Sequence, residues 1–311
     1  MTLPVAFDAA LAALVLAMAA WVVLARTAFA ATVGFVACGL LLTLAWFGLG
    51  APDVAMTEAA IGSGVTGALL IGAAARQPAG EGEDDRPGRL VRIAIAVLCA
   101  AVAAAIAAAV LLLPDPAPSL TAEAVASLPA TGVGNPVTAV LMAYRALDTL
   151  LEMAVLVLAL LAVWSLAPDH AWGGRPGPAP SPAPEPLVFL ARLLPPAGIV
   201  VGVHLLWTGA DHPGGAFQGG TVLGAMWLLL WMAGLAPVPA TGGRTLRVVL
   251  VAGVALFVAV GLAGLPLAGA FLAYPPSLAK PLILLVEAAK ILSVAAAMAL
   301  LVAGPPLRRP S

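Results

Sequence analysis

The chain has 311 residues, of which 62% are hydrophobic and 9% are charged, and its mean hydropathy is +1.08. Soluble domains carry about 25% charged residues, so this composition excludes a water-soluble globular protein and predicts an integral membrane protein. A formal net charge of −1 gives no indication of nucleic-acid binding.

Nine segments are long and apolar enough to cross a bilayer, which takes about 20 residues in a helix. They lie approximately at residues 4–25, 27–49, 53–75, 90–113, 136–166, 187–209, 214–236, 245–270 and 278–303. The first segment lacks a basic n-region, so we expect a retained helix rather than a removed signal peptide. The predicted fold class is an all-α polytopic membrane protein with about nine transmembrane helices.

The basic residues fall in alternate connections between these segments. They are Arg26, Arg76, Arg86, Arg89, Arg92, Arg175, Arg192, Arg244, Arg247, Arg308 and Arg309. The remaining connections lack Lys and Arg, so the positive-inside rule predicts an outer N-terminus and a cytoplasmic C-terminus. We expect a multi-pass protein of a bacterial or archaeal inner membrane.

Two linkers divide the chain into blocks of three, two and four helices. Residues 77–89 are charged and rich in Gly and Pro, whereas the Pro-rich residues 167–186 predict an extended, semi-rigid spacer. The blocks comprise residues 1–76, 90–166 and 187–311. Both linkers are expected in the cytoplasm, and a short surface helix is expected near 119–127.

Ionisable residues at membrane depth are the functional candidates, because each costs roughly 2.5–3.5 kcal/mol and must face protein or water. Glu58 lies in PDVAMTEAAIGSGVTGALL, where Pro52 and Asp53 indicate a helix start with Asp53 as the N-cap. Thr57 precedes Glu58, and several small residues follow it. Glu58 either caps a closely packed neighbouring helix or takes part in proton or cation transfer.

Three charges interrupt the apolar segment 136–166. Arg145, Asp148 and Glu152 have the spacing of one helical face, and Thr149 adds a hydroxyl group nearby. Two carboxylates with one guanidinium leave a surplus negative charge, which raises a carboxyl pKa. The alternatives are a structural ion-pair network and a relay that exchanges protons or attracts cations.

Two further regions supply candidates. His204 is either a hydrogen-bonded packing residue or functional, while Asp211 and His212 lie in a polar turn before a glycine-rich helix start, GGAFQGG. The glycines allow either a broken helix that binds ions or plain close packing. Glu287 and Lys290 are spaced i, i+3, and form either a structural buried pair or a titrating one.

Three stretches resemble subunits of one family. APDVAMTEAAIGSGVTGALL is similar to the D-x-A-x-T-E-A segment of the three-helix hydrogenase subunit, which is also the C-terminal part of the large Mrp antiporter A subunit. NPVTAVLMAYRALDTLLE resembles the adjoining two-helix module, N-x-V-T-x-x-L-x-x-[FY]-R-x-x-D-T-L-G-E. GADHPGGAFQGG resembles the G-H-x-x-P-G-G-G-F-x-G-G motif of the four-helix B subunit.

The resemblance is to the multisubunit Mrp-type Na+(K+)/H+ antiporters and their hydrogenase relatives. It implies ion-path roles for Glu58, Arg145, Asp148, Thr149 and Glu152, and Glu287 is similar to an acidic residue in the last B-subunit helix. The chain departs from the family motifs at three positions and has a lysine without a family counterpart. These residues are Ala210 in place of His, Ala216 and Leu151 in place of Gly, and Lys290.

The resemblance therefore implies a fused subunit that lines or supports a cation or proton path from the outer face. Its implied partners are other Mrp-type subunits, including large antiporter-like ones, in a lipid bilayer. Na+, K+ or H+ would be transported, and no cofactor, metal site or catalytic residue is expected. The alternatives are an ion-translocating subunit of a hydrogenase or related redox complex, a structural membrane scaffold, and a transporter that works alone.

Overall fold

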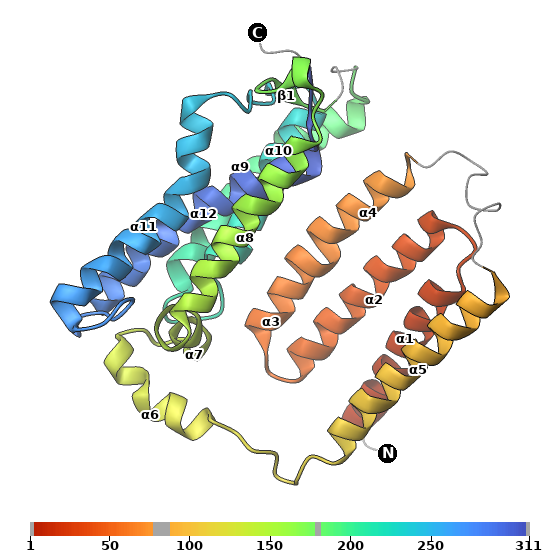
Figure 1. Ribbon diagram of the computed structural model, residues 1–311, viewed down its shortest axis with the longest axis horizontal. Coiled ribbons are helices and arrows are strands. Elements are labelled where there is room, and N and C mark those ends of the chain that lie inside the picture. The colour runs from red at the N-terminus through yellow and green to blue at the C-terminus, as the bar shows by residue number, and fades with distance from the viewer. Residues whose placement is uncertain (1–2, 77–87, 178–181, 309–311) are drawn as a thin grey trace.

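The computed structural model of the chain describes residues 3–76, 88–177 and 182–308, and its regular structure is almost entirely helical (Figure 1). Within these residues, eight helices are long and apolar enough to cross a membrane. They are α1 (Leu3–Leu24), α2 (Ala28–Gly48), the continuous α3–η1–α4 (Pro52–Ala74), α5 (Arg89–Leu111), α8 (Ala146–Ser165), α9 (Glu185–Thr208), α11 (Arg244–Ala268) and α12 (Ala279–Ala303). The predicted all-α polytopic class is confirmed.

The ninth predicted span corresponds to α10 (Ala216–Met232), which is shorter than residues 214–236. Its 17 residues reach about 25 Å at 1.5 Å per residue. The shortening has a local cause, because Gly214 and Gly215 adopt φ values of 152° and 137° and hold the chain outside the helix. The helix therefore begins only at Ala216.

The helices α8 to α12 form a C-terminal bundle with α12 at its centre. Small residues allow this packing, since a Cβ added at Gly220 of α10 would lie 2.8 Å from Val294 of α12. A Cβ at Gly219 would lie 2.6 Å from the carbonyl oxygen of Gly202 on α9. Close approach through small residues is typical of membrane helices, which gain little from hydrophobic burial against lipid.

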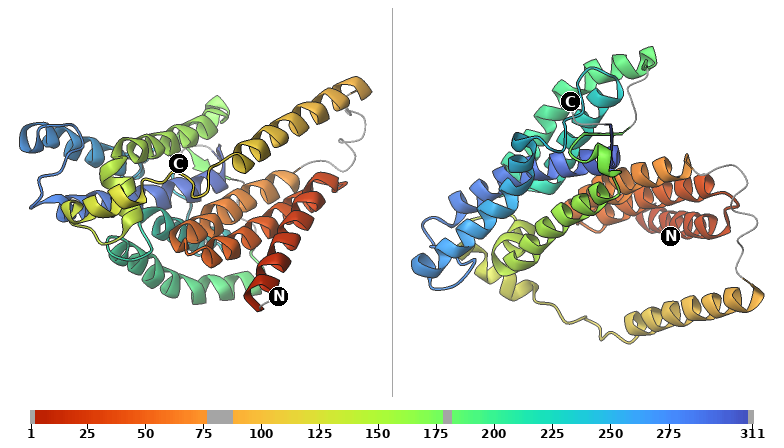
Figure 2. Two further views of the ribbon diagram at one scale, coloured as in Figure 1. Left: turned by 90° about the horizontal axis from the view of Figure 1, so that it is seen from below. Right: turned by 45° about the horizontal axis from the view of Figure 1, so that its top comes forward.

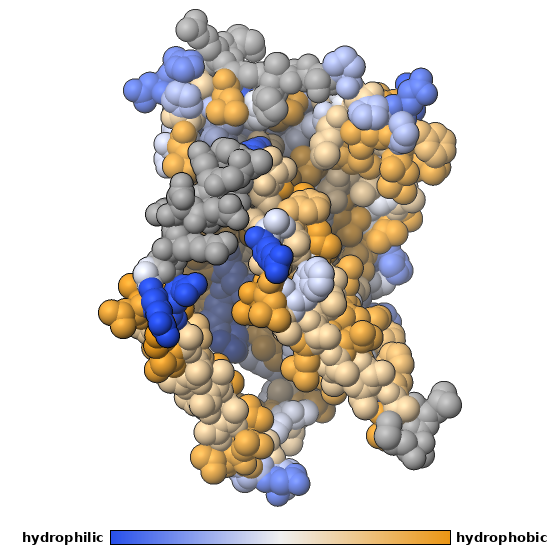
Figure 3. All heavy atoms as spheres, turned by 90° about the vertical axis from the view of Figure 1, so that its right-hand side faces the viewer, coloured by the Kyte–Doolittle hydropathy of each residue, from blue (hydrophilic) through white to orange (hydrophobic). Residues whose placement is uncertain are grey.

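The helices α1 to α4 form a second bundle, which contacts the first through α3, the π-helical segment η1 (Glu58–Val65) and α4. Helix α5 buries none of its residues and lies apart from α1 to α4 in both views of Figure 2. Figure 3 shows the apolar surface of this side of the molecule, with hydrophilic side chains visible at the back of a hollow. Much apolar helix surface is therefore left for lipid or other chains.

The single helix predicted for residues 136–166 is wrong. Helix α7 (Pro136–Ala139) continues into the π-helical segment η2 (Val140–Tyr144), and the helix breaks at Arg145, whose φ and ψ are −127° and 36°. Only α8 is a full span. The predicted surface helix is confirmed as α6 (Thr121–Thr131), which lies at an angle of 84° to Pro136–Tyr144.

The described part of the Pro-rich linker is folded, so the prediction of an extended spacer is wrong there. It contains a 3-10 turn, η3 (Asp169–Ala171), and a strand, β1 (Arg175–Pro176), which pairs antiparallel with β2 (Pro306–Arg308). The carbonyl oxygens of Gly173 and Gly174 also accept hydrogen bonds from the loop before α11. Residues 178–181, and residues 77–87 of the first predicted linker, lie outside the described residues.

The connections between helices alternate between two ends of the molecule. Figure 1 shows the N-terminus, the start of α3 and helices α6 and α7 at the lower end, and the C-terminus and β1 at the upper end. This alternation agrees with the two groups of connections distinguished by their basic residues. Which end faces the cytoplasm stays a prediction from the charge distribution.

Candidate functional site

A cavity of about 630 Å3 lies where helices from all three predicted blocks meet. Its walls come from α3 and η1, from α7 to α8, and from α10 and α12. The polar side chains that line it are Asp53, Thr57, Thr138, Glu152, Gln218, Glu287 and Lys290. The rest of the lining is mostly apolar, as in other ligand and ion cavities of proteins. Four of the candidate ionisable residues therefore share one space.

Glu287 and Lys290 form an ion pair within this cavity, as the i, i+3 spacing predicts. The Lys290 ammonium donates a hydrogen bond to Glu287 Oε1, and their side chains are only 3% and 11% exposed. The Lys290 Nζ atom also lies 5.3 Å from the centre of the Phe217 ring. Burial at this level is tolerable only because each charge has its partner.

The other oxygen of Glu287 binds the beginning of α10. The Ala216 amide donates to Glu287 Oε2 at 2.8 Å, so a carboxylate from α12 satisfies one of the free N–H groups of this helix. Gly214 and Gly215 provide the positive φ values that expose these amides. The glycine-rich turn thus directs N–H groups towards carboxylates, and the glycines further along α10 serve close packing.

Gln218 connects the two bundles across the cavity and was missed in the sequence. Its Nε2 atom donates to the Thr57 hydroxyl at 3.0 Å, and that hydroxyl donates to the Asp53 carbonyl oxygen at 2.9 Å. Gln218 is 8% exposed. A buried amide in an otherwise apolar helix was the signal available, because such groups need hydrogen-bond partners.

Asp53 is not the N-cap of α3, as the sequence suggested, because the cap position belongs to Ala51. Asp53 is 6% exposed, and its Oδ1 atom accepts hydrogen bonds from the Gly214 amide at 2.9 Å and from Asn135 Nδ2 at 3.5 Å. The side chain is turned away from its own helix end. It joins segments that are 82 and 161 residues distant in sequence.

Asn135 is a second residue that the sequence analysis missed. Its Oδ1 atom accepts from the Val137 amide and caps α7, while its Nδ2 atom donates to the carbonyl oxygen of His212 at 3.0 Å. The Thr138 hydroxyl donates to the carbonyl oxygen of Gly209. An Asn directly before Pro136 is a typical helix start, which was the available signal.

The break at Arg145 divides the roles of the three charges that were expected on one continuous face. Arg145 Nε donates to Asp148 Oδ2 at 2.6 Å, with side chains 71% and 48% exposed. Glu152 is exposed and lines both the 630 Å3 cavity and a neighbouring cavity of about 400 Å3, which also contains Arg145 and Asp148. The Thr149 hydroxyl donates to the Leu141 carbonyl oxygen and spans the break.

Two candidates lie away from the cavity. Glu58 is half-buried and faces α2, since a Cβ added at Gly39 would lie 2.9 Å from Glu58 Oε1. The neighbouring Ser63 hydroxyl is buried and has no hydrogen-bond partner among the described residues. His204 is exposed on α9 and lines none of the three cavities described for this structure.

Asp211 and His212 lie on the surface of the loop between α9 and α10. Asp211 pairs with Lys280 at 2.7 Å and accepts the Gly134 amide at 3.1 Å. The hydrogen bond from Lys280 holds the pKa of Asp211 below its usual range. Both residues line a third cavity of about 290 Å3, together with Asp53 and Asn135.

Comparison with known proteins adds two family matches and one structural match. The MbhD family model, which describes a component of MBH, matches residues 13–79, and one described as "Domain related to MnhB subunit of Na+/H+ antiporter" matches residues 186–305. A chain in the "Structure of Mrp complex from Dietzia sp. DQ12-45-1b" has a TM-score of 0.75 and 26% sequence identity. The match covers 97% of this chain and 35% of that longer chain. No curated protein matches the sequence.

Proposed function

Since this chain is an Mrp-type fusion of an MbhD-like segment and an MnhB-like segment, we propose that it is a membrane subunit of a multisubunit monovalent cation/proton antiporter. The observation that carries this proposal is the 630 Å3 cavity, to which both segments and the helices between them contribute ionisable side chains. Ionisable groups at membrane depth are costly and mark ion or proton paths. The partners would be other Mrp-type subunits, including large antiporter-like ones.

The unburied surface of the chain supports an assembly. Helix α5 buries none of its 23 residues against the rest of the chain, so neighbouring chains or lipid must cover it. We place the assembly in a bacterial or archaeal inner membrane, with Na+ or K+ as the exchanged cation. The chain is proposed to act in transport rather than as an enzyme.

The proposed path uses Glu152 as its exchangeable carboxylate. Glu287 already has one oxygen bonded to Lys290 and the other to the Ala216 amide, so it holds the cavity wall in place. Glu152 has no ion-pair partner among the described residues and is exposed to the cavity. An accessible, unpaired carboxylate can exchange a proton or attract a cation without breaking other contacts.

The test compares two carboxylates on α8 that lie one turn apart. Glu152→Gln removes the cavity charge, whereas Asp148→Asn removes a charge that pairs with Arg145 at the surface. The full chain would be expressed with its partner subunits, and proton movement on addition of Na+ or K+ would be measured in vesicles. We expect Glu152→Gln to lose most of the exchange and Asp148→Asn to keep most of it.

Copurification distinguishes the other candidate functions. If both variants assemble and exchange normally, the chain is a structural scaffold and the path lies in other subunits. If iron–sulfur and nickel proteins copurify from native membranes, the complex belongs to the redox class. If the purified chain transports alone, the proposal of a subunit is wrong.

A further inference from the structure

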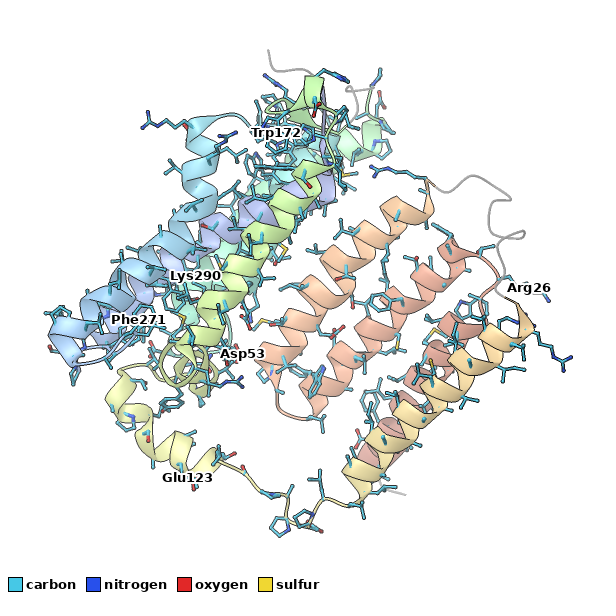
Figure 4. The ribbon with its side chains drawn as sticks, in the orientation of Figure 1. Arg26, Asp53, Glu123, Trp172, Phe271 and Lys290 are labelled. Atoms are coloured by element: carbon cyan, nitrogen blue, oxygen red, sulfur yellow. The ribbon has the colours of Figure 1, made fainter. Side chains whose placement is uncertain are left out.

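Two of the cavities meet at one charged side chain. The 630 Å3 cavity at membrane depth and the 290 Å3 cavity beside the surface loops share only three lining residues, which are Asp53, Val54 and Val137. Two of these are apolar. Asp53 is therefore the single ionisable group at the junction, and Figure 4 shows it at the end of α3, nearer than Lys290 to the loop end of the molecule.

The carboxylate of Asp53 is fixed from one side only. Its Oδ1 atom accepts the Gly214 amide and Asn135 Nδ2, whereas Oδ2 accepts no hydrogen bond from the described residues. The Gly214 and Asn135 contacts come from different helical connections and hold the side chain across the junction. A buried carboxylate with one uncommitted oxygen attracts cations and repels anions over a short range.

We propose that Asp53 is the charge-selective barrier of the path, through which a monovalent cation or proton passes from the loop-side cavity to the cavity that contains Glu152. This inference rests on the proposed function and adds the residue that sets the sign of the permeating charge. Asp211 and His212 line the loop-side cavity in front of this barrier, but both are exposed. Neither of them lines the inner cavity.

Thiol labelling reads this barrier without requiring transport. Cys38 and Cys99 are replaced by Ala, and a single cysteine is placed at Ile61, which lines the inner cavity, or at His212, which lines the outer one. The full chain is assembled with its partner subunits and solubilised. The probes are a cationic and an anionic methanethiosulfonate of similar size, and the measured quantity is the ratio of their reaction rates.

We expect the cationic reagent to react faster at Ile61→Cys by about tenfold more than at His212→Cys. Asp53→Asn keeps the shape and the Oδ1 acceptor, and should bring the Ile61→Cys ratio down to the His212→Cys value. Asp53→Glu should preserve the preference for the cationic reagent. If Asp53→Asn does not assemble, the comparison of the two cysteines in the presence of Asp53 still tests the proposal.

Two results would overturn it: a ratio at Ile61→Cys that equals that at His212→Cys or does not change in Asp53→Asn, and an Ile61→Cys that reacts with neither reagent. Labelling and transport fail independently. A flat ratio in a complex with normal exchange removes the barrier but keeps the proposed function. A charge-dependent ratio in a complex without exchange keeps the barrier and removes the antiporter.

Discussion

Lys290→Met would leave the Glu287 carboxylate buried without its ammonium partner while keeping an apolar side chain of similar length. Lys290 is 2% exposed and Glu287 is 8% exposed, so water cannot replace the lost contact. The Ala216 amide would remain as a hydrogen-bond donor to the carboxylate. Breaking a buried ion pair on one side costs about 3–5 kcal/mol, and this residual donor favours the lower end.

The double variant Glu287→Gln/Lys290→Met separates the charge from the packing. The Gln carbonyl oxygen can still accept the Ala216 amide, and no unpaired charge is left. Removing both members of a buried pair is often nearly neutral, so we expect the double variant to be more stable than Lys290→Met by about 2 kcal/mol. The free energies of unfolding of the assembled complex, or its melting temperatures, measure this difference.

For a chain of this size, about 3 kcal/mol corresponds to a shift in melting temperature on the order of 10 °C. A Lys290→Met complex as stable as the unmodified one would refute the assignment of a structural pair. So would a double variant less stable than either single variant. Exchange measured on the stable double variant then decides whether the pair also takes part in transport.

Three further predictions concern the loop end of the path. Gly214→Ala should destabilise the protein by at least about 2 kcal/mol, because φ is 152° and the new Cβ would lie 2.5 Å from the Leu205 carbonyl oxygen; Gly72→Ala, in open space on α4, is the control and should be neutral or slightly stabilising when thermal unfolding is compared. Asn135→Ala should cost about 1–3 kcal/mol, since it removes the α7 cap and the bond to the His212 carbonyl oxygen; an unchanged melting temperature would contradict this. The lowered pKa of Asp211 means that its bond with Lys280 stabilises the protein above the unfolded pKa and is lost as the pH falls through the lower, folded pKa. Lys280→Met should therefore cost no more than about 1 kcal/mol near pH 7 and nothing in acid below about pH 3, as measured by unfolding across that range; a cost that grows in acid would reverse the sign.

The sequence predicted the spans well because apolar length is a direct consequence of bilayer thickness. It failed at Arg145, where a continuous apolar run hides a break in the helix. Hydropathy does not report backbone geometry, and the adjacent π-helical turn is set by packing and by the Thr149 hydroxyl, which donates across the break. The folded part of the Pro-rich linker was also missed, because its partners lie in the loop before α11 and at the C-terminal end.

The candidate site was predicted in its ionisable residues and not in its connections. Membrane-depth charges identify themselves by their cost, and four of those named from the sequence line one cavity. The sequence could not place Glu58 towards α2, because helix rotation depends on which neighbour packs against which face. Asn135 and Gln218 were missed, since uncharged polar residues are common in membrane helices and only their partners show their role.

The hydrogen bonds of each carboxylate separate scaffold from path. Both oxygens of Glu287 are bonded, and exchanging a proton there would release the beginning of α10 and the Lys290 ammonium together. One oxygen of Asp53 is bonded to two segments, so this side chain can meet an ion without leaving its place. Glu152 has neither constraint. A route along which each successive carboxylate is less tightly held favours movement from Asp53 to Glu152, with Glu287 keeping the cavity open between the two bundles.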